Sequence, residues 1–496
     1  MKTAGGPDGI PPVFIKHCAD ELSGPLAKLF ELSFEFSFLP PEWCTGYVAP
    51  IYKKGERTDP RNYRPIVLTS SLCKLMESVI KEQLLNYFLS NGFFTRHQHA
   101  FLTHHSTTTN LIECTHDWSL SLHASGTTDV IYVDMARAFD SIVFSKLLYK
   151  LELYGVTGNL LKWISGFICN RTQRVLLENY FSGICNVLSG VPQGSVLGPI
   201  LFIIFINDIV HICDGGAVLK LFADDAKIYI EIDFANRSLQ SSLSNLSLYA
   251  SDSQLSINIA KCFVMSVNKS GSESAHSYSI NNTVLNRCSS ISDLGITVCS
   301  NLAFNDHISS IASKALQRSG VFFRGFTSRD LSLLRKAFIT YIRPIVEYGS
   351  VVWNPSTVYL IDLLESVQRK FTKRVHSISH LPYSERLVKL NLDSLELRRL
   401  RFDLIHYFKF LILKQPPGLD ERFIVHIPPN SARSTFPLLC KPAHSSNKLD
   451  ANFFFRQTNV WNSLPATLKS CKSLPSFKRR LLEINLSSFL AGSMYR

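Results

Sequence analysis

Two adjacent aspartates, Asp224 and Asp225, interrupt an otherwise mostly apolar stretch at residues 219–230. Residues typical of β-strands precede and follow them, so the stretch predicts a β-hairpin whose turn is acidic. Successive side chains on a strand point to opposite faces, but at a hairpin tip both can reach one region of space. Carboxylates held that close repel each other unless a cation lies between them. A pair of divalent metal ions would supply that cation and would also support phosphoryl transfer.

Asp134 and a glycine-rich loop accompany the acidic pair. Asp134 ends a short apolar run at residues 129–133, which predicts a buried strand with a helix after it. Asp140, further along, is interpreted as a helix-start residue. Residues 189–199 are rich in Gly and Pro and lead into the apolar run 200–206. An Asp-Asp pair alone is common in turns that bind nothing. Turn formation does not explain why a strand-end Asp134, a glycine-rich loop and an Asp-Asp hairpin follow one another in this order.

These three features resemble motifs A, B and C of a reverse transcriptase palm, in the order in which that family carries them. Other segments resemble the polymerase of non-LTR (LINE-type) retrotransposons, in particular the Jockey and CR1 types, along almost the whole chain. The segments are residues 2–12 at the start of the polymerase region, 50–55 and 62–66 in its fingers, 341–349 and 352–355 in its thumb, and 460–465 and 476–478 at its carboxyl end.

The resemblance implies an α/β fold of the right-hand polymerase type, with fingers, a palm made of an antiparallel sheet backed by helices, and a helical thumb. Apolar periodicity agrees, because it predicts helices near 69–92 and 238–253 and a hairpin at 218–231. The predicted domains are fingers at 1–115, a palm with motifs A to E at 116–300, a basic helical thumb at 301–415, and a small C-terminal tail module at 416–496.

Asp134, Asp224 and Asp225 are the predicted catalytic metal ligands. The resemblance implies that Asp134 and Asp224 are the main ligands of two metal ions and that Asp225 is auxiliary. Carboxylate oxygens suit magnesium, Mg²⁺, with Mn²⁺ as an alternative. Lys261 lies in a segment that resembles motif D, where the lysine would protonate the leaving pyrophosphate. A lone lysine after a strand is otherwise a solvated side chain.

The resemblance also implies a pocket for the incoming nucleotide. Phe139 would close the sugar pocket against a 2′-hydroxyl, although its periodicity alone indicates a core residue. Gln193 and Gly194 would shape the pocket, since glycine lets backbone approach a base closely; a tight turn is the alternative. Three basic residues of the fingers would contact the triphosphate: Lys53, Lys54 and Arg64.

A basic, leucine-rich stretch of the predicted thumb is the candidate nucleic-acid surface. Apolar residues interleave with the Lys and Arg residues and would provide the packing face. Phosphate contacts from the charged face would be independent of sequence and sensitive to salt; a solvated helix face is the alternative. The residues are Arg369, Lys370, Lys373, Arg374, Arg398, Arg399 and Arg401.

Composition is consistent with a polyanionic partner. The chain has 496 residues, a formal net charge of +13 and a pI near 9.1, which favours nucleic acid or an acidic membrane. Its 12 cysteines show no zinc-ligand spacing and are interpreted as reduced thiols. The amino terminus does not resemble a signal peptide, and the apolar run 196–206 is too short to cross a bilayer. We therefore expect a nuclear or cytoplasmic protein that is neither secreted nor bound to a membrane.

The expected function is RNA-directed DNA polymerase, with an RNA template, a DNA primer, dNTPs, and the element RNA held as a ribonucleoprotein. No endonuclease segment precedes the fingers motif, so we expect that activity to be absent from this chain. In residues 98–107, Ala100 and Leu102 replace a glycine and a cation of relatives. A catalytically inactive nucleic-acid-binding relic is therefore the alternative. A maturase of the group II intron type is disfavoured by residues 343–355 and 461–465.

Overall fold

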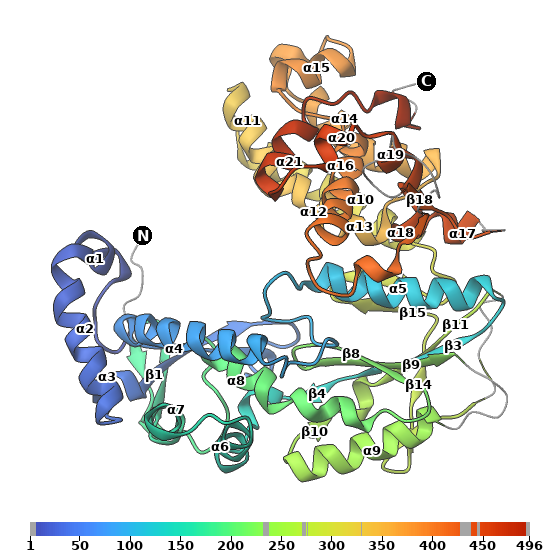
Figure 1. Cartoon of the computed structure of the whole chain (residues 1–496). Coiled ribbons are helices and arrows are strands. Elements are labelled where there is room, and N and C mark those ends of the chain that lie inside the picture. The colour runs from blue at the N-terminus through green and yellow to red at the C-terminus, as the bar shows by residue number, and fades with distance from the viewer. Residues whose placement is uncertain are drawn as a thin grey trace.

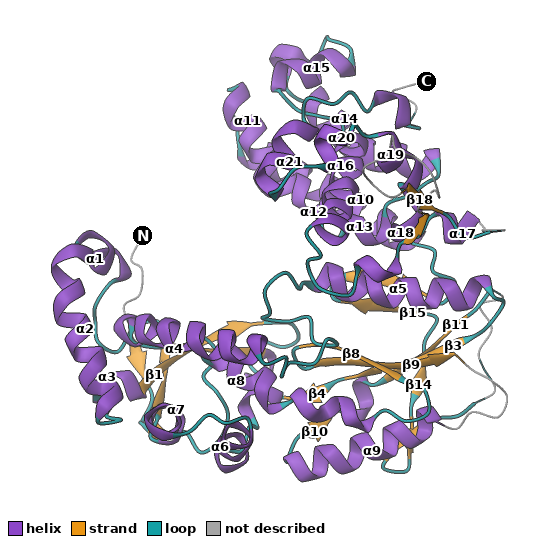
Figure 2. Cartoon of the chain, in the orientation of Figure 1, coloured by secondary structure: helices purple, strands orange, loops and turns teal. Residues whose placement is uncertain are grey.

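Helices and strands of the chain form three groups in a computed structural model (Figure 1). The structure describes residues 6–231, 238–269, 274, 276–328, 330–426, 438–443 and 447–492. The first group is a five-stranded sheet surrounded by helices, the second is another five-stranded sheet with helices on both faces, and the third is mostly helical (Figure 2). The chain therefore has the mixed α/β, right-hand architecture that the sequence predicted.

The first group, the fingers, is organised around strand β1 (Thr45–Tyr52). It pairs antiparallel with β2 (Tyr63–Leu68) and parallel with β5 (Thr172–Leu177). Residues 172–186 therefore join the fingers sheet, although they lie inside the predicted palm range. The other elements of this group are α1 (Pro12–His17), α2 (Ala19–Glu35), α3 (Pro41–Cys44), α4 (Ser71–Ser90), α6 (Phe144–Leu153), α7 (Gly158–Cys169), β6 (Tyr180–Phe181) and β7 (Cys185–Asn186).

The start of α4 is held by residues near the amino terminus. Ser70 caps the helix, because its Oγ accepts a hydrogen bond from the Cys73 N–H at 3.1 Å. Asp8 in turn accepts from Ser70 Oγ at 2.5 Å and from the Ser71 N–H at 3.1 Å. A carboxylate at a helix N-terminus is also favoured by the helix dipole. Residues 6–12, the described part of the segment that resembles the family's opening, are thereby fastened to the fingers.

The second group, the palm, is a sheet with strand order β14-β11-β3-β9-β8. Central strand β3 (Thr128–Val133) pairs antiparallel with β11 (Phe263–Val267) and with β9 (Asp225–Glu231). Strand β8 (Val218–Phe222) pairs antiparallel with β9 and ends the order, and β14 (Asn286–Arg287) is parallel to β11. The predicted antiparallel palm sheet is confirmed for every pair of strands except β11 and β14.

The palm sheet is buried on both faces, which explains why most residues of its strands are apolar. On β3, Val130 and Tyr132 pack with α5 (Thr107–His123) and the thumb, whereas Ile131 and Val133 pack with the helices of the opposite face. Successive side chains point to opposite faces, so a strand buried on both sides has no polar alternation. Figure 1 shows α5 on one face and α9 (Ser238–Ser253) on the other.

The third group contains the thumb and the C-terminal tail, which share one hydrophobic core. The ring of Phe477 stacks on Phe408, with centroids 4.2 Å apart and an interplanar angle of 13°. Arg456 donates to the buried carboxylate of Asp403 at 2.5 Å. The elements are α10 (Asn305–Gly325), α11 (Leu331–Ala337), α12 (Arg343–Glu347), α13 (Ser350–Trp353), α14 (Val358–Lys373), α15 (Tyr383–Leu390), α16 (Leu395–Tyr407), β17 (Ile424–His426), β18 (Leu438–Cys440), α17 (Asn447–Asp450), α18 (Phe453–Arg456), α19 (Thr458–Ser463), α20 (Ala466–Lys469) and α21 (Leu474–Leu481).

Two of the predicted domain boundaries fall inside continuous structure. The boundary at 115/116 lies within helix α5, and the boundary at 415/416 divides the core that thumb and tail share. Parts of the predicted tail, residues 427–437, 444–446 and 493–496, lie outside the described residues. Within the described ranges, no helix has the length and apolar character needed to cross a lipid bilayer.

Candidate active site

The two adjacent aspartates lie at the turn between β8 and β9, as the sequence predicted. Phe222 pairs with Asp225 at the last position of the hairpin, so Ala223 and Asp224 form the turn between them. Ala223 has a φ of +56°, a left-handed conformation that is uncommon for residues other than glycine. Asp224 is partly buried and Asp225 is exposed.

Asp134 lies beside this turn and interacts with it electrostatically. It directly follows β3, where Val133 is opposite Ala226, the residue after Asp225. Burial raises the pKa of Asp224, and the negative charge of Asp134 raises it further. Partial desolvation of its carboxyl and then the charge of Asp224 raise the pKa of Asp225 to about 6. Three carboxylates from two segments therefore repel one another, an arrangement that a cation would relieve.

These carboxylates match the donor chemistry of a hard divalent cation. Across the part of the chain that the structure describes, no cluster of three or more His, Cys, Asp or Glu side chains could hold a metal ion unaided. Mg²⁺ commonly takes only one or two carboxylates and completes its shell with water and phosphate oxygens. Asp134 and Asp224 repel each other and supply oxygen donors, so they fit a site in which two carboxylates share a metal ion with water and phosphate oxygens.

Lys261 lies next to Asp134, with Nζ 3.4 Å from Oδ2. It ends a short 3₁₀ helix, Ile259–Lys261, which follows β10 (Ser256–Ile257). Strand β10 pairs with β4 (Met135–Ala136), and the Asn258 N–H donates to the Asp134 carbonyl at 2.8 Å. The lysine side chain is 65% exposed, so its ammonium group is free to exchange the carboxylate for another anion.

Two fingers cations act on the acidic turn. Arg64 lies on β2 opposite Ile51, and the Lys53 N–H donates to the Asn62 carbonyl at 2.8 Å. The positive charges of Arg64 and Lys53 oppose the effect of burial on the pKa of Asp224. Lys54 is exposed next to Lys53. Fingers cations and palm carboxylates are thus close enough to interact electrostatically.

The glycine-rich loop is held between the fingers and the corner that follows Asp134. The Gln193 side chain donates to Asp140 Oδ1 at 2.8 Å. The backbone carbonyl of Gln193 accepts from the Val67 N–H at 2.8 Å. Gly190 (φ +85°) and Gly194 (φ +137°) have no room for a Cβ. A Cβ on Gly190 would lie 2.6 Å from the Asp140 Cα, and a Cβ on Gly194 would lie 2.4 Å from the Val67 backbone oxygen. Glycine is therefore required at both positions by the close approach of two other segments.

Asp140 differs from its sequence interpretation. Instead of starting a helix, it ends a short 3₁₀ helix, Ala138–Asp140, and the α-helix expected after Asp134 begins only at Phe144. Its carboxylate and carbonyl hold Gln193 and Ser189 of the glycine-rich loop. Burial raises the pKa of Asp140, and the hydrogen bond from Gln193 opposes that effect.

Phe139 has one side in the core and one side partly open. Its ring stacks on Phe202 of α8 (Gly198–Phe205), with centroids 4.1 Å apart and an interplanar angle of 12°. The ring of Phe101, an exposed residue, is nearly perpendicular to that of Phe139, with centroids 6.3 Å apart. A ring anchored by Phe202 has a defined position, as a gate beside a sugar would require.

The thumb residues predicted to bind nucleic acid divide into exposed and buried ones. Lys370, Lys373 and Arg374, at the end of α14, are exposed, and the partly buried Arg369 lies over the ring of Tyr383. These four residues remain available for phosphate contacts.

Arg399 was predicted to contact nucleic acid, and that prediction is wrong. It is 1% exposed, and its Nε donates to Asn354 at 3.1 Å inside the thumb core. Its neighbours on α16 are partly buried: Arg398 pairs with Glu347, and Arg401 pairs with Asp393 at 2.7 Å. Helical spacing directs neighbouring positions to different sides of a helix, which the composition of the stretch did not reveal.

A buried polar layer beneath the acidic turn was missed by sequence reasoning. The Lys227 side chain is 3% exposed and pairs with Asp293 at 2.7 Å and with Asn110 at 2.6 Å. Lys220, opposite Lys227 in the hairpin, pairs with Glu113 of α5. The available signal was the two lysines in otherwise apolar strands, since a buried charge requires a partner.

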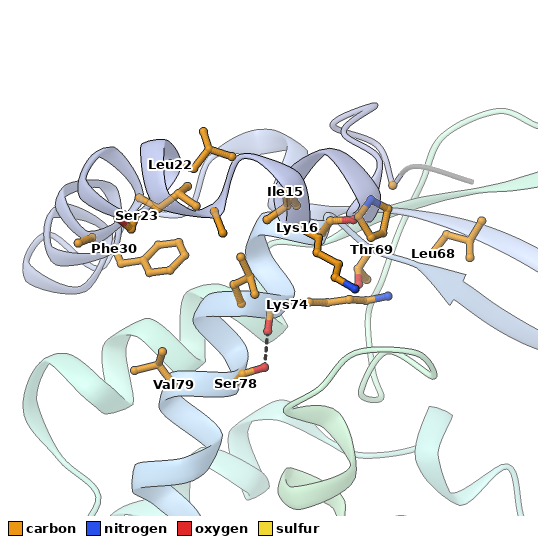
Figure 3. A pocket seen from close by; sticks show the side chains of 17 residues that line it. Ile15, Lys16, Leu22, Ser23, Phe30, Leu68, Thr69, Lys74, Ser78 and Val79 are labelled. Carbon is orange, nitrogen blue, oxygen red and sulfur yellow. Dashed lines mark hydrogen bonds between the residues drawn. The ribbon is translucent and has the colours of Figure 1, made fainter. Parts of the chain in front are cut away.

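A large apolar groove lies away from these residues. It measures about 850 Å³ and runs between the N-terminal helices and α4. Figure 3 shows Ile15, Leu22 and Phe30 on one side and Val79 on the other. None of the described residues that line it is Asp or Glu, so they do not provide the acidic chemistry found at the turn.

Residues 51–298 match the family model described as reverse transcriptase (RNA-dependent DNA polymerase). Two similar proteins of Drosophila melanogaster are a probable RNA-directed DNA polymerase from transposon BS, 26% identical over 392 residues, and the RNA-directed DNA polymerase from mobile element jockey, 25% identical over 389 residues. The matches cover 74% and 76% of this chain and 42% of each relative, so the chain spans less than half of their length. The solved structure of a Candida tropicalis telomerase in complex with a fragment of telomeric RNA is 13% identical, covers 81% of this chain and 66% of that one, and has a TM-score of 0.42.

Proposed function

The chain belongs to the reverse transcriptase family, and we propose that it extends the 3′-hydroxyl of a DNA primer with dNTPs on an RNA template. The observation that carries this proposal is the convergence of Asp134, Asp224 and Asp225 opposite Lys53 and Arg64. Carboxylates that repel one another and cations across from them form the charge pattern that nucleotidyl transfer needs. This pattern lies inside the matched residues 51–298.

Reverse transcriptases in general use divalent metal ions, and two Mg²⁺ ions, replaceable by Mn²⁺, are the proposed cofactors here. Such ions, held by the carboxylates, would supply a lowered pKa for the primer hydroxyl and neutralisation of charge on the phosphates. Asp134 and Asp224 hold them in this proposal, and Asp225 raises the negative charge of the site. Lys261, 3.4 Å from Asp134, is placed to deliver a proton to the leaving group.

The remaining predicted site residues receive the nucleotide. Lys53, Lys54 and Arg64 bind the triphosphate, with Arg64 suited to bidentate contacts. Phe139, anchored by stacking at 4.1 Å, restricts the space beside the sugar 2′ carbon. Gln193 and Gly194 form the pocket wall.

The proposed source is a non-LTR retrotransposon of the Jockey type, whose element RNA would be template and ribonucleoprotein partner. The net charge of +13 supports a polyanionic partner. Lys370, Lys373 and Arg374 are the proposed thumb contacts to the phosphate backbone. Such an enzyme would act in the nucleus or the cytoplasm, where RNA template and DNA target lie.

Primer extension by the Asp224→Asn variant tests the proposal. The substitution keeps the side-chain shape and removes the charge, so template–primer binding should persist while extension falls at least about 10³-fold. Asp306→Asn, which changes an exposed carboxylate of α10, is the matched control and should extend like the wild type. Extension by Asp224→Asn at the wild-type rate would contradict the metal role. Folded wild-type protein that binds template–primer but never extends it would identify an inactive relic.

A further inference from the structure

Residues 97–100 extend the palm sheet along the edge of β8. The Leu221 N–H donates to the His97 carbonyl at 2.9 Å, and the His99 N–H donates to the Leu221 carbonyl at 3.0 Å. Gln98 is thereby opposite Leu221 in a parallel bridge. Gln98 is 1% exposed and Ala100 is 0% exposed. The first residues of the segment 98–107 therefore lie in the interior, next to the acidic turn.

The Gln98 side chain binds the one residue that separates Phe222 from Asp224. Its Oε1 accepts from the Ala223 N–H at 3.0 Å, and its Nε2 donates to the Ala223 carbonyl at 3.5 Å. The same Oε1 accepts from the Ala100 N–H at 2.9 Å. A glutamine amide has both a donor and an acceptor, so one side chain satisfies both backbone groups of Ala223.

The acidic turn needs such an anchor for two reasons. Ala223 has a φ of +56°, which a residue with a Cβ keeps only when its surroundings hold it there. Asp224 and Asp225 also repel each other, so the turn gains by moving them apart. Because Gln98 is buried, water cannot replace its hydrogen bonds if they are lost.

We propose that Gln98 is a positioning residue that fixes Ala223 and thereby the directions of the Asp224 and Asp225 carboxylates. Gln98 touches neither substrate nor metal and acts only through the backbone of the turn. The expected effect of Gln98 on catalysis rests on the proposed function. Its structural consequence, a rigid turn, is measurable without any activity.

The chain provides a matched control in Gln240 of α9. Its Nε2 donates to the Ser279 carbonyl at 2.9 Å, and its Oε1 accepts from the Ser279 N–H at 3.0 Å. This is the same two-way contact between a glutamine and the backbone of one residue. Ser279 belongs to the small hairpin of β12 (Ser279–Ile280) and β13 (Thr283–Val284), outside the acidic site.

Gln98→Met and Gln240→Met are compared in two measurements, because methionine keeps the length of the side chain and loses every hydrogen bond of the amide, including the one from the Ala100 N–H to Gln98. In metal-free buffer, hydrogen exchange of the peptide covering residues 219–226 should be at least about tenfold faster in Gln98→Met only. In primer extension, Gln98→Met should lower kcat at least about tenfold and leave KM for dNTP within about twofold, because the carboxylates are misdirected while the fingers cations still bind substrate. Gln240→Met should match the wild type in both.

Each outcome decides the proposal. Unchanged exchange in residues 219–226 of Gln98→Met would overturn it, and so would faster exchange with an unchanged kcat. If wild-type protein extends no primer, the proposed function fails, while the exchange measurement still decides whether Gln98 holds the turn. If Gln98→Met does not fold, Gln98→Asn takes its place, since it keeps a neutral amide but is one methylene too short to make both hydrogen bonds to Ala223 at full strength. A smaller change in the same direction is then expected, and its absence would overturn the proposal.

Discussion

Replacing Asp225 by Asn should stabilise the folded protein near neutral pH. Partial desolvation and then the charge of Asp224 raise the pKa of the Asp225 carboxyl from 3.8 to about 6. A carboxyl whose pKa is higher in the folded state destabilises that state whenever it is ionised. The cost is complete above the folded pKa of about 6 and disappears as the pH falls towards 3.8, where the unfolded chain also binds the proton.

The size of the effect follows from the two pKa values. Their difference, 6 minus 3.8, corresponds to about 3 kcal/mol at 1.36 kcal/mol per pKa unit. Asp225 is exposed, so water screens much of the repulsion, and we expect about 1 kcal/mol. For a chain of this length that free energy corresponds to a rise in Tm of about 1–2 °C.

Thermal unfolding of wild type and Asp225→Asn, in the presence of a chelator, measures this gain. The variant should melt higher at about pH 7.5 and at the wild-type temperature near pH 4. Asp306→Asn, which changes an exposed carboxylate in the first turn of α10, is the control and should show no gain in stability at about pH 7.5, because the helix dipole favours a carboxylate there. A variant that is less stable at neutral pH, or whose gain does not change with pH, would refute the view that the acidic turn stores repulsion.

Three further predictions concern the pocket, the thumb and the buried layer. Phe139→Val should raise ribonucleotide relative to deoxyribonucleotide incorporation, because it removes the ring beside the sugar; an unchanged ratio in single-nucleotide extension would make Phe139 a core residue only. The exposed cations at the end of α14 are Lys370, Lys373 and Arg374. Neutralising all three should reduce the slope of log affinity against log salt concentration by up to about three, measured with labelled template–primer. An unchanged slope would assign phosphate binding to another surface. Lys227→Met should cost about 3–5 kcal/mol in urea unfolding, because it leaves the Asp293 charge buried without its partner. The Lys227→Met, Asp293→Leu double variant should recover most of that loss, and a double variant no more stable than the single one would contradict the pairing.

The sequence by itself determined the local elements and the chemistry of the site. The buried strand at 129–133, the hairpin at 218–231 and the helix at 238–253 follow from periodicity, because each is specified by neighbours along the chain. The adjacent Asp224 and Asp225 could be assigned to a turn from the same pattern. Lys220 and Lys227 carried a signal as well, since charges in apolar strands require buried partners.

Only the tertiary structure decided which side chains those elements bring together. Arg399 faces the thumb core and Lys370 faces solvent, a difference set by how α16 and α14 dock and not by their composition. Asp140 holds Gln193, and Gln98 holds Ala223, across long separations in sequence. Such contacts depend on strand register and on the approach of distant segments, for which a local pattern contains no information. The acidic residues were therefore readable from the chain, whereas the groups that orient them became visible only in the fold.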